Sequence, residues 1–153
     1  MDLINYIRDI PDFPKKGILY KDISPLLLNK KAFSFTTDQF YTRHVNNKID
    51  LVIGIEARGF IFGSSLANRL GCGFVPIRKS NKLPSNTFKQ SYNLEYGTDS
   101  IEIHKDAIKN HDNVLLVDDV LATGGTAYAA IQLLENFNCS LVECLFLLEL
   151  SSL

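Results

Sequence analysis

The stretch Val114–Thr126, with the sequence VLLVDDVLATGGT, constrains the fold of this chain more than any other. It begins with apolar, β-prone residues, continues through the adjacent carboxylates Asp118 and Asp119, and ends in a turn of small residues. An alanine-rich segment with a helical spacing of apolar residues follows at 125–137. This order predicts a strand at 114–117, an acidic pair at its end, a glycine turn and then a helix.

The turn formed by Ala122, Thr123, Gly124, Gly125 and Thr126 has the composition of an anion site. Its two glycines allow positive φ and a close approach of backbone to ligand. Successive N–H groups that end at a helix N-terminus make a concave cradle for a phosphate. The turn matches neither a Walker loop nor GxGxxG. A plain strand-to-helix turn also favours glycine and threonine, so both interpretations stay open for the turn alone.

Asp118 and Asp119 favour the interpretation as a ligand site. Neighbouring carboxylates at a strand end repel each other and lose hydration when buried, so the fold alone rarely requires them. The two vicinal hydroxyls of a ribose, or water molecules around a magnesium ion, would account for both side chains. A solvated pair in a loop is the alternative. Together with the glycine turn, the pair predicts a site for a ribose 5-phosphate group.

The overall composition narrows the classes of protein to consider. With 153 residues, of which 46% are hydrophobic and 22% charged, the chain suits one soluble domain with a real core. The formal net charge of −1 argues against nucleic-acid binding, and no apolar run is long enough to span a membrane. The N-terminus lacks the features of a secretory signal. Three cysteines without CxxC spacing favour free thiols over zinc, and we expect a cytoplasmic protein.

Other segments predict strands that alternate with helices. Strands are expected at 51–55, 73–77 and 141–148, with shorter ones at 18–21 and 101–104. Helices are expected at 3–9, 31–45 and 59–70; Asp2 would cap the first and Gly71 would end the last. Residues 78–99 are polar with few periodic apolar positions, so we expect a long excursion there, with room for two short strands.

This alternation implies an α/β domain with a mainly parallel sheet. In such sheets, ligands bind beyond the carboxyl ends of the strands. Glu56–Gly59 follows the strand expected at 51–55, just as Asp118–Thr126 follows the strand expected at 114–117. The two motifs should therefore face one cleft.

Basic residues occur in the Glu56–Gly59 motif and in the excursion at 78–99. Arg58, at the start of the helix at 59–70, can hold a phosphate oxygen with a forked pair of hydrogen bonds; a surface arginine at an ordinary helix start is the alternative. The excursion at 78–99 carries a basic cluster of Arg78, Lys79, Lys82 and Lys89. Such a cluster fits a polyanionic ligand and also a solvated loop. The length of the excursion favours function, because long irregular segments in compact domains are often lids.

Five motifs in order resemble the type I phosphoribosyltransferase family, and its adenine-specific members in particular. VLLVDDVLATGGT is similar to the family signature that binds the donor, 5-phosphoribosyl 1-pyrophosphate. The other four motifs are GILYKDISP, IEARGFIFG, PIRKSNKLP and SYNLEYG. The resemblance runs from about residue 9 to the last residue. Five motifs in register are more specific than any one of them.

The resemblance implies the type I phosphoribosyltransferase fold, a mainly parallel twisted sheet flanked by helices, in a single domain at 1–153. A small N-terminal hood at about 1–30 would precede a core at about 31–153, with a mobile loop at about 80–100. The C-terminal tail usual in the family would be missing, which leaves an inactive truncated form as one alternative. The resemblance further implies a homodimer that requires Mg²⁺, held by the substrate and by water rather than directly by protein.

The implied reaction is transfer of the 5-phosphoribosyl group to adenine, which gives AMP and pyrophosphate in purine salvage. Glu95 and Arg58 would be the catalytic residues: Glu95 would take the ring proton of adenine, and Arg58 would contact pyrophosphate. A transferase for hypoxanthine, xanthine or orotate is one alternative. A non-catalytic, donor-binding regulator of transcription is another, although the chain has no room for a DNA-binding module.

The resemblance also assigns substrate-binding residues motif by motif. The 5-phosphate would bind to Ala122, Thr123, Gly124, Gly125 and Thr126, and the ribose hydroxyls to Asp118 and Asp119. The pyrophosphate loop, with a cis peptide bond, would be Glu56, Ala57, Arg58 and Gly59. Pyrophosphate would also be reached, partly across a dimer interface, by Arg78, Lys79 and Lys82.

The remaining assignments concern the base and the closing loop. Adenine would be read by the hood residues Leu19, Tyr20 and Lys21, largely through backbone contacts and aromatic packing. Lys21 stands where the family often has arginine, and a backbone contact makes the effect of that change small. The loop that closes over the site would carry Glu95 and Tyr96, and its closure would exclude water from the donor.

Overall fold

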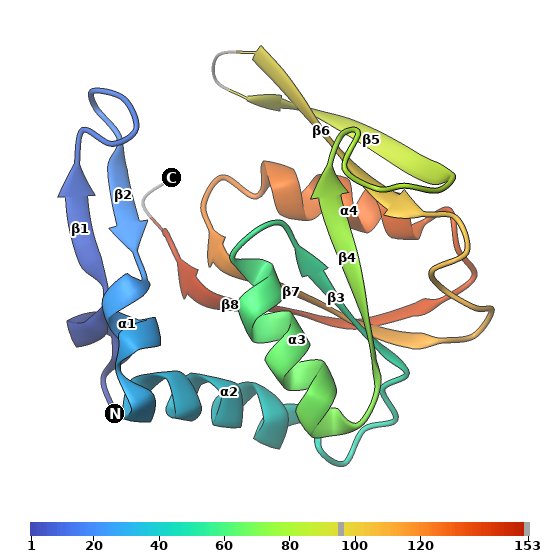
Figure 1. Ribbon diagram of the computed structural model, residues 1–153, viewed down its shortest axis with the longest axis horizontal. Helices are drawn as coiled ribbons and strands as arrows, with labels where there is room; N and C mark the ends of the chain where they lie inside the picture. Colours follow the sequence, from blue (N-terminus) through green and yellow to red (C-terminus); the bar gives the residue numbers. More distant parts are fainter. Residues whose placement is uncertain (95–96, 152–153) are drawn as a thin grey trace. The chain divides into compact units, whose positions relative to one another are not determined.

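The computed structural model describes residues 1–94 and 97–151 of the chain (Figure 1). These residues divide into two compact units, Met1–Thr42 and Arg43–Leu153. The division into a hood at about 1–30 and a core at about 31–153 stays a prediction. The units are described separately below.

The N-terminal unit begins with the short 3-10 helix η1 (Leu3–Tyr6). Asp2 is its N-cap, as expected, and accepts a hydrogen bond from the Ile4 N–H at 3.2 Å. The helix is shorter than the one expected at 3–9, because the next residues form strand β1 (Arg8–Pro11), which pairs antiparallel with β2 (Leu19–Asp22). The remaining helices of this part are α1 (Ser24–Leu28) and α2 (Lys30–His44), and α2 matches the helix expected at 31–45.

The C-terminal unit is built on a six-stranded sheet with the order β5-β6-β4-β3-β7-β8 (Figure 1). Its strands are β3 (Leu51–Ile55), β4 (Gly73–Lys79), β5 (Thr87–Leu94), β6 (Gly97–His104), β7 (Asn113–Leu121) and β8 (Ser140–Glu149). Neighbours among β4, β3, β7 and β8 run parallel. Strands β6 and β5 add an antiparallel pair at the β4 edge. The mainly parallel α/β sheet expected from the sequence is confirmed.

Helices α3 (Gly59–Leu70) and α4 (Gly125–Leu134) cover opposite faces of this sheet. Side chains alternate between faces along β3, so Ile53 lies on one face and Gly54 on the other. Ile53 belongs to a hydrophobic cluster that includes Leu133 of α4. A Cβ on Gly54 would instead lie 3.1 Å from the Gly59 carbonyl oxygen at the start of α3. Each helix thus buries its apolar side against the sheet.

Strand β7 lies between β3 and β8 in the sheet, and its apolar run Val114–Val117 is fully buried. A strand covered on both faces needs such a continuous apolar run rather than alternation. The strand extends past its expected end at Val117 to Leu121, because β8 pairs with it that far. Strand β3 pairs with it only as far as Val117. Asp118 and Asp119 therefore lie within the strand and not after it, contrary to the expectation.

The polar excursion expected at 78–99 is mostly a regular β-hairpin. Strands β5 and β6 pair over eight residues each, from Thr87 opposite His104 to Leu94 opposite Gly97. Ile101 and Ile103 of β6 are buried, while the residues of β5 are half-buried or exposed. Only one side of β5 contacts the core, through Phe88 and Tyr92. The sequence did not predict β5 as a long strand because its other residues, apart from the exposed Leu94, are polar.

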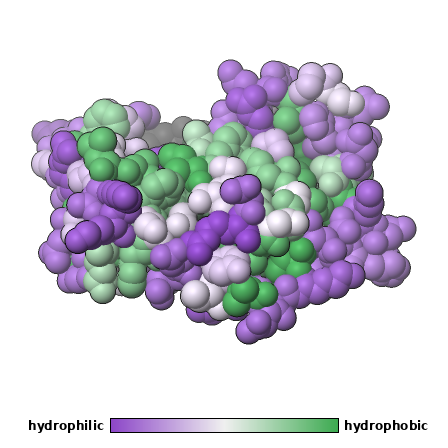
Figure 2. Space-filling view, turned by 60° about the horizontal axis from the view of Figure 1, so that its bottom comes forward, coloured by the Kyte–Doolittle hydropathy of each residue, from purple (hydrophilic) through white to green (hydrophobic). Residues whose placement is uncertain are grey.

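The helices of the described part are too short or too polar to cross a membrane. The longest of them, α2, has 15 residues and carries charged side chains at both ends. On the face shown in Figure 2, hydrophilic residues are interspersed with smaller hydrophobic patches. Cys72, Cys139 and Cys144 are free thiols, as expected.

The close approach of α3 to β7 predicts that Gly59 tolerates no side chain. A Cβ at this position would lie 2.7 Å from the Val117 carbonyl oxygen and 3.2 Å from the Asp118 Cα, both of which are backbone atoms. Because backbone must move to relieve the overlap, Gly59→Ala should lower the free energy of unfolding by about 1–3 kcal/mol in urea titrations. Asn68→Ala, at an exposed position of the same helix, is the control and should change it by less than about 0.5 kcal/mol. Equal stability of the two variants would contradict the packing argument.

Candidate functional site

The turn Ala122–Thr126 lines a pocket at the N-terminus of α4. The turn brings together Ala122, Thr123, Gly124, Gly125 and Thr126, as the sequence predicts. Gly124 has φ +86°, a left-handed conformation that favours glycine. No side chain of the described residues caps α4, so the first N–H groups of the helix have no such acceptor. These N–H groups and the positive end of the helix make the pocket suitable for an anion.

Asp118 contributes a carboxylate to the wall of this pocket. Its Oδ1 accepts a hydrogen bond from the Asp119 N–H at 2.8 Å. Burial, together with the neighbouring carboxylate of Asp119, raises the pKa of Asp118 to about 7, although the Asp119 N–H and the charge of Arg58 act in the opposite direction. The pocket therefore combines amide donors with one carboxyl group that titrates near neutral pH.

Asp119 is only 4% exposed and pairs with a cation inside the protein. Its Oδ2 lies 2.7 Å from Nε of Arg58, which directly precedes α3. The alternative of a solvated loop pair is wrong, because both aspartates belong to β7 and Asp119 is buried. The contact also shows that the Glu56–Gly59 and Asp118–Thr126 segments lie side by side, as their positions after neighbouring parallel strands predict.

Glu56 organises the backbone and side chains of the loop between β3 and α3. The peptide bond between Glu56 and Ala57 is cis, as expected. The carboxylate accepts hydrogen bonds from the Lys79 N–H at 2.8 Å and from Nε and Nη2 of Arg78 at 3.2 and 3.3 Å. Burial alone would raise the pKa of Glu56, but these hydrogen bonds and the charges of Arg78 and Lys82 outweigh it and lower the pKa. Glu56 is thus an anion that holds the Arg78 fork.

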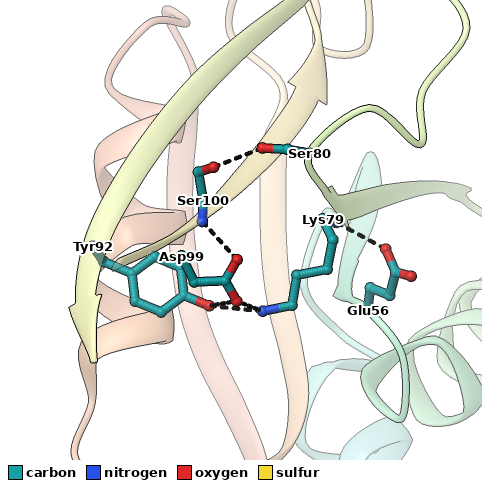
Figure 3. Close-up of polar contacts among 6 residues, drawn as sticks. All are labelled: Glu56, Lys79, Ser80, Tyr92, Asp99 and Ser100. Carbon is teal, nitrogen blue, oxygen red and sulfur yellow. Dashed lines mark hydrogen bonds and ion pairs between the residues drawn. The ribbon is translucent and has the colours of Figure 1, made fainter. Parts of the chain in front are cut away.

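Three of the basic residues expected near pyrophosphate lie close to the Glu56 loop or to each other. They are Arg78, Lys79 and Lys82. Arg78 Nη1 donates to the Lys82 carbonyl oxygen at 3.3 Å, so Arg78 joins Glu56 to the segment after β4. The side chain of Lys82 is itself exposed. Lys79 contacts Glu56 through its backbone, while its side chain extends toward the β5–β6 hairpin (Figure 3).

The ammonium of Lys79 meets two residues of the hairpin (Figure 3). It forms an ion pair with Asp99 and a hydrogen bond of 2.9 Å with the Tyr92 hydroxyl. The hydroxyl in turn donates to Asp99 Oδ2 at 3.2 Å. The Lys79 ammonium lowers the pKa of Asp99. Burial alone would lower the pKa of Lys79, but the hydrogen bonds to Asp99 and Tyr92 raise it, so both groups stay charged.

Sequence reasoning missed Asp99. Its role depends on the hairpin register, which places Tyr92 directly opposite Asp99. The sequence offers only a weak signal for that register, because the residues of β5 other than Phe88, Tyr92 and Leu94 are polar.

The other predicted residues are described by the elements to which they belong. Leu19, Tyr20 and Lys21 stand together on β2 of the N-terminal unit, where the Tyr20 ring packs edge-on against Phe13 with ring centroids 5.1 Å apart. Lys21 Nζ lies 2.6 Å from Asp9 Oδ1. Lys89 is exposed on β5. Glu95 and Tyr96 lie outside the described residues.

Comparison with known proteins shows the family to which this chain belongs. The phosphoribosyl transferase domain family matches residues 29–152. An adenine phosphoribosyltransferase of Geobacter metallireducens is 55% identical over 152 residues, which cover 99% of this chain and 89% of that protein.

Two solved structures are also similar. Adenine phosphoribosyltransferase from Rhodothermus marinus is 49% identical with a TM-score of 0.93, over 98% of this chain and 85% of that one. The Saccharomyces cerevisiae enzyme, solved with adenine and D-2,5-dideoxy-2,5-imino-altritol 1,6-bisphosphate, is 44% identical with a TM-score of 0.93, over 98% and 88% of the two chains. This chain therefore belongs to the phosphoribosyl transferase family and, within it, to the adenine phosphoribosyltransferases.

Proposed function

We propose that this chain transfers the 5-phosphoribosyl group from 5-phosphoribosyl 1-pyrophosphate to adenine and releases AMP and pyrophosphate. The observation that carries the proposal is the amide-lined pocket at Ala122–Thr126 with Asp118 in its wall. Next to it, Arg58 is held by Asp119, with Nε 2.7 Å from Oδ2. A phosphate cradle, a carboxyl group and a cation in this order match the 5-phosphate, the ribose hydroxyls and the pyrophosphate of the donor. The yeast relative binds adenine, which supports adenine as the acceptor.

The cradle and Asp118 would hold the sugar end of the donor. The first N–H groups of α4, which no side chain of the described residues caps, would donate to the 5-phosphate, with the helix dipole favouring its negative charge. Asp118 would accept hydrogen bonds from ribose hydroxyls. Asp119 would reach the same hydroxyls only by leaving its ion pair with Arg58. Both roles fix the anomeric carbon relative to the leaving group.

Arg58, Arg78, Lys79 and Lys82 would stabilise the leaving pyrophosphate. Cleavage of the bond at the anomeric carbon leaves positive charge on the sugar and negative charge on pyrophosphate. Three of the four cations are already fixed near the loop by Asp119, Glu56 and Asp99, which limits the reorganisation needed at the moment of reaction.

We also propose Mg²⁺ as the cofactor. In the described residues, no group of three or more His, Cys, Asp or Glu side chains is arranged to hold a metal. Mg²⁺ usually keeps several waters and binds substrate phosphates with one or two carboxylates, so a donor-held ion with Asp118 nearby fits this pocket. When bound, it would neutralise charge on the pyrophosphate.

The remaining roles rest on the resemblance. Glu95 would accept the ring proton of adenine, Tyr96 would help to cover the site, and Leu19, Tyr20 and Lys21 would read the base. We further propose a homodimer in the cytoplasm, in which Lys82 or its neighbours reach the partner's pyrophosphate.

The direct test of the proposed function is conversion of labelled adenine to AMP by the purified chain with donor and Mg²⁺. We expect turnover with adenine, loss of turnover when EDTA removes the metal, and its return when Mg²⁺ is added. Competition with unlabelled hypoxanthine, xanthine and orotate tests the base. Faster turnover of any of these bases would establish the alternative substrate, and no turnover with any base would reject the enzyme.

Removing the proton acceptor should affect chemistry more than binding. Glu95→Gln should lower kcat by roughly 100-fold or more, because it removes the general base, while donor affinity stays within about threefold. Glu135→Gln, the same change at an exposed site after α4, is the matched control and should leave kcat unchanged. Unchanged kcat in Glu95→Gln would eliminate the proposed proton role.

Protonation of Asp118 should weaken ribose binding below its pKa of about 7. The ionised form accepts hydrogen bonds from the ribose hydroxyls. The affinity for ribose 5-phosphate should therefore reach its maximum above pH 8 and fall roughly tenfold per pH unit below pH 6. Asp119 and Arg58 are the charged groups that face Asp118. Because the phosphate of the ligand also titrates, Asp118→Asn supplies the reference in calorimetric titrations. An equal ratio of the two affinities at pH 6 and pH 8 would show that Asp118 does not titrate in this range.

A further inference from the structure

Tyr92 lies between the phosphate turn and the loop that carries Glu56. Its hydroxyl is 2.9 Å from Lys79 Nζ and 3.2 Å from Asp99 Oδ2 (Figure 3). The Lys79 ammonium also lies 5.5 Å from the centre of the Tyr92 ring. The side chain of Tyr92 thus contacts the Lys79 ammonium through its hydroxyl.

The ring of Tyr92 also approaches the backbone of the phosphate turn. A Cβ on Gly125 would lie 3.8 Å from Tyr92 Cδ2 and 3.9 Å from the Asn93 carbonyl oxygen, which is ordinary van der Waals contact. The same ring packs against the hydrophobic cluster that contains Leu133 of α4. The Tyr92 end of β5 therefore lies beside the first turn of α4.

Lys79 completes the connection to the other loop. Its backbone N–H donates to Glu56 Oε2 at 2.8 Å, and its side chain ends at Tyr92 and Asp99. A series of contacts therefore runs from Tyr92, whose ring lies beside Gly125, through Lys79 to Glu56. It joins the two loops that the proposed function assigns to the 5-phosphate and to pyrophosphate.

We propose that Tyr92 is a positioning residue for the donor, with two separable parts. Its ring fixes the position of the backbone of the phosphate turn. Its hydroxyl, together with Asp99, fixes the position of the Lys79 ammonium that would contact pyrophosphate. This inference rests on the proposed function, since it takes the two loops as the sites of the two ends of the donor.

The chain supplies a matched control for a purely structural role of the hairpin. Ser80 Oγ and Ser100 Oγ are hydrogen-bonded at 2.6 Å between the end of β4 and β6 (Figure 3). Each serine directly follows a member of the ion pair, Lys79 or Asp99. Ser100→Ala removes this connection and keeps the Ser100 N–H that donates to Asp99 Oδ1 at 2.8 Å.

The test measures the affinities of pyrophosphate and ribose 5-phosphate separately, by calorimetry of the full chain with Mg²⁺. Tyr92→Phe removes only the hydroxyl and should weaken pyrophosphate binding about tenfold, with ribose 5-phosphate within twofold of the unmodified chain. Tyr92→Leu removes the ring as well and should weaken both ligands. Ser100→Ala should change neither. Thermal unfolding of each variant verifies that it is folded.

A double-mutant cycle tests whether Tyr92 acts through Lys79. Tyr92→Phe should have no further effect on pyrophosphate binding in a Lys79→Ala background. The inference is overturned if Tyr92→Phe leaves pyrophosphate affinity within twofold, if Ser100→Ala weakens it equally, or if the two substitutions are additive. Failure of the unmodified chain to bind either ligand would instead reject the proposed function.

Discussion

The burial of β7 on both faces is the constraint on which the rest of the structure depends. The fully buried run Val114–Val117 requires cover on each side, which α3 and α4 provide. The pairing with β3 ends at Val117, whereas pairing with β8 continues to Leu121. The next residues of β7 therefore have one edge without a β3 partner, and this is where Asp118 and Asp119 lie. The place of the acidic pair follows from how the core strand is paired.

Sequence reasoning located the parts of the fold and site that depend on local signals. The apolar run before Asp118, the glycine turn at 124–125 and the cap at Gly71 each have a strong local pattern, and the structure contains all three. It failed where pairing between distant residues decides the structure. The extension of β7 depends on β8, and the contact of Tyr92 with Asp99 depends on the register of a hairpin whose residues are mostly polar. Neither has a strong signal within a short window.

Each of three cations near the proposed pyrophosphate site has a carboxylate of its own. Arg58 is paired with Asp119, Arg78 with Glu56 and Lys79 with Asp99. These pairs hold the cations in place without leaving a cluster of uncompensated positive charge in a half-buried region. An incoming polyanion would have to share or replace these carboxylates. The arrangement exchanges some binding affinity for fixed geometry, which is what stabilisation of a departing anion requires.

The attachment of the hairpin has a mechanical consequence. Its own strands share eight residue pairs, but within the described residues it joins β4 through only two, Arg78 opposite Glu102 and Lys79 opposite Ile101. A displacement of the hairpin about this short attachment would also have to break the packing of Phe88 and Tyr92 against the hydrophobic cluster that contains Leu133 of α4. Arg78 and Lys79 form this attachment, and their charged groups are paired with Glu56 and Asp99, respectively. A ligand that binds these two side chains would thus act directly on the residues that attach the hairpin to β4.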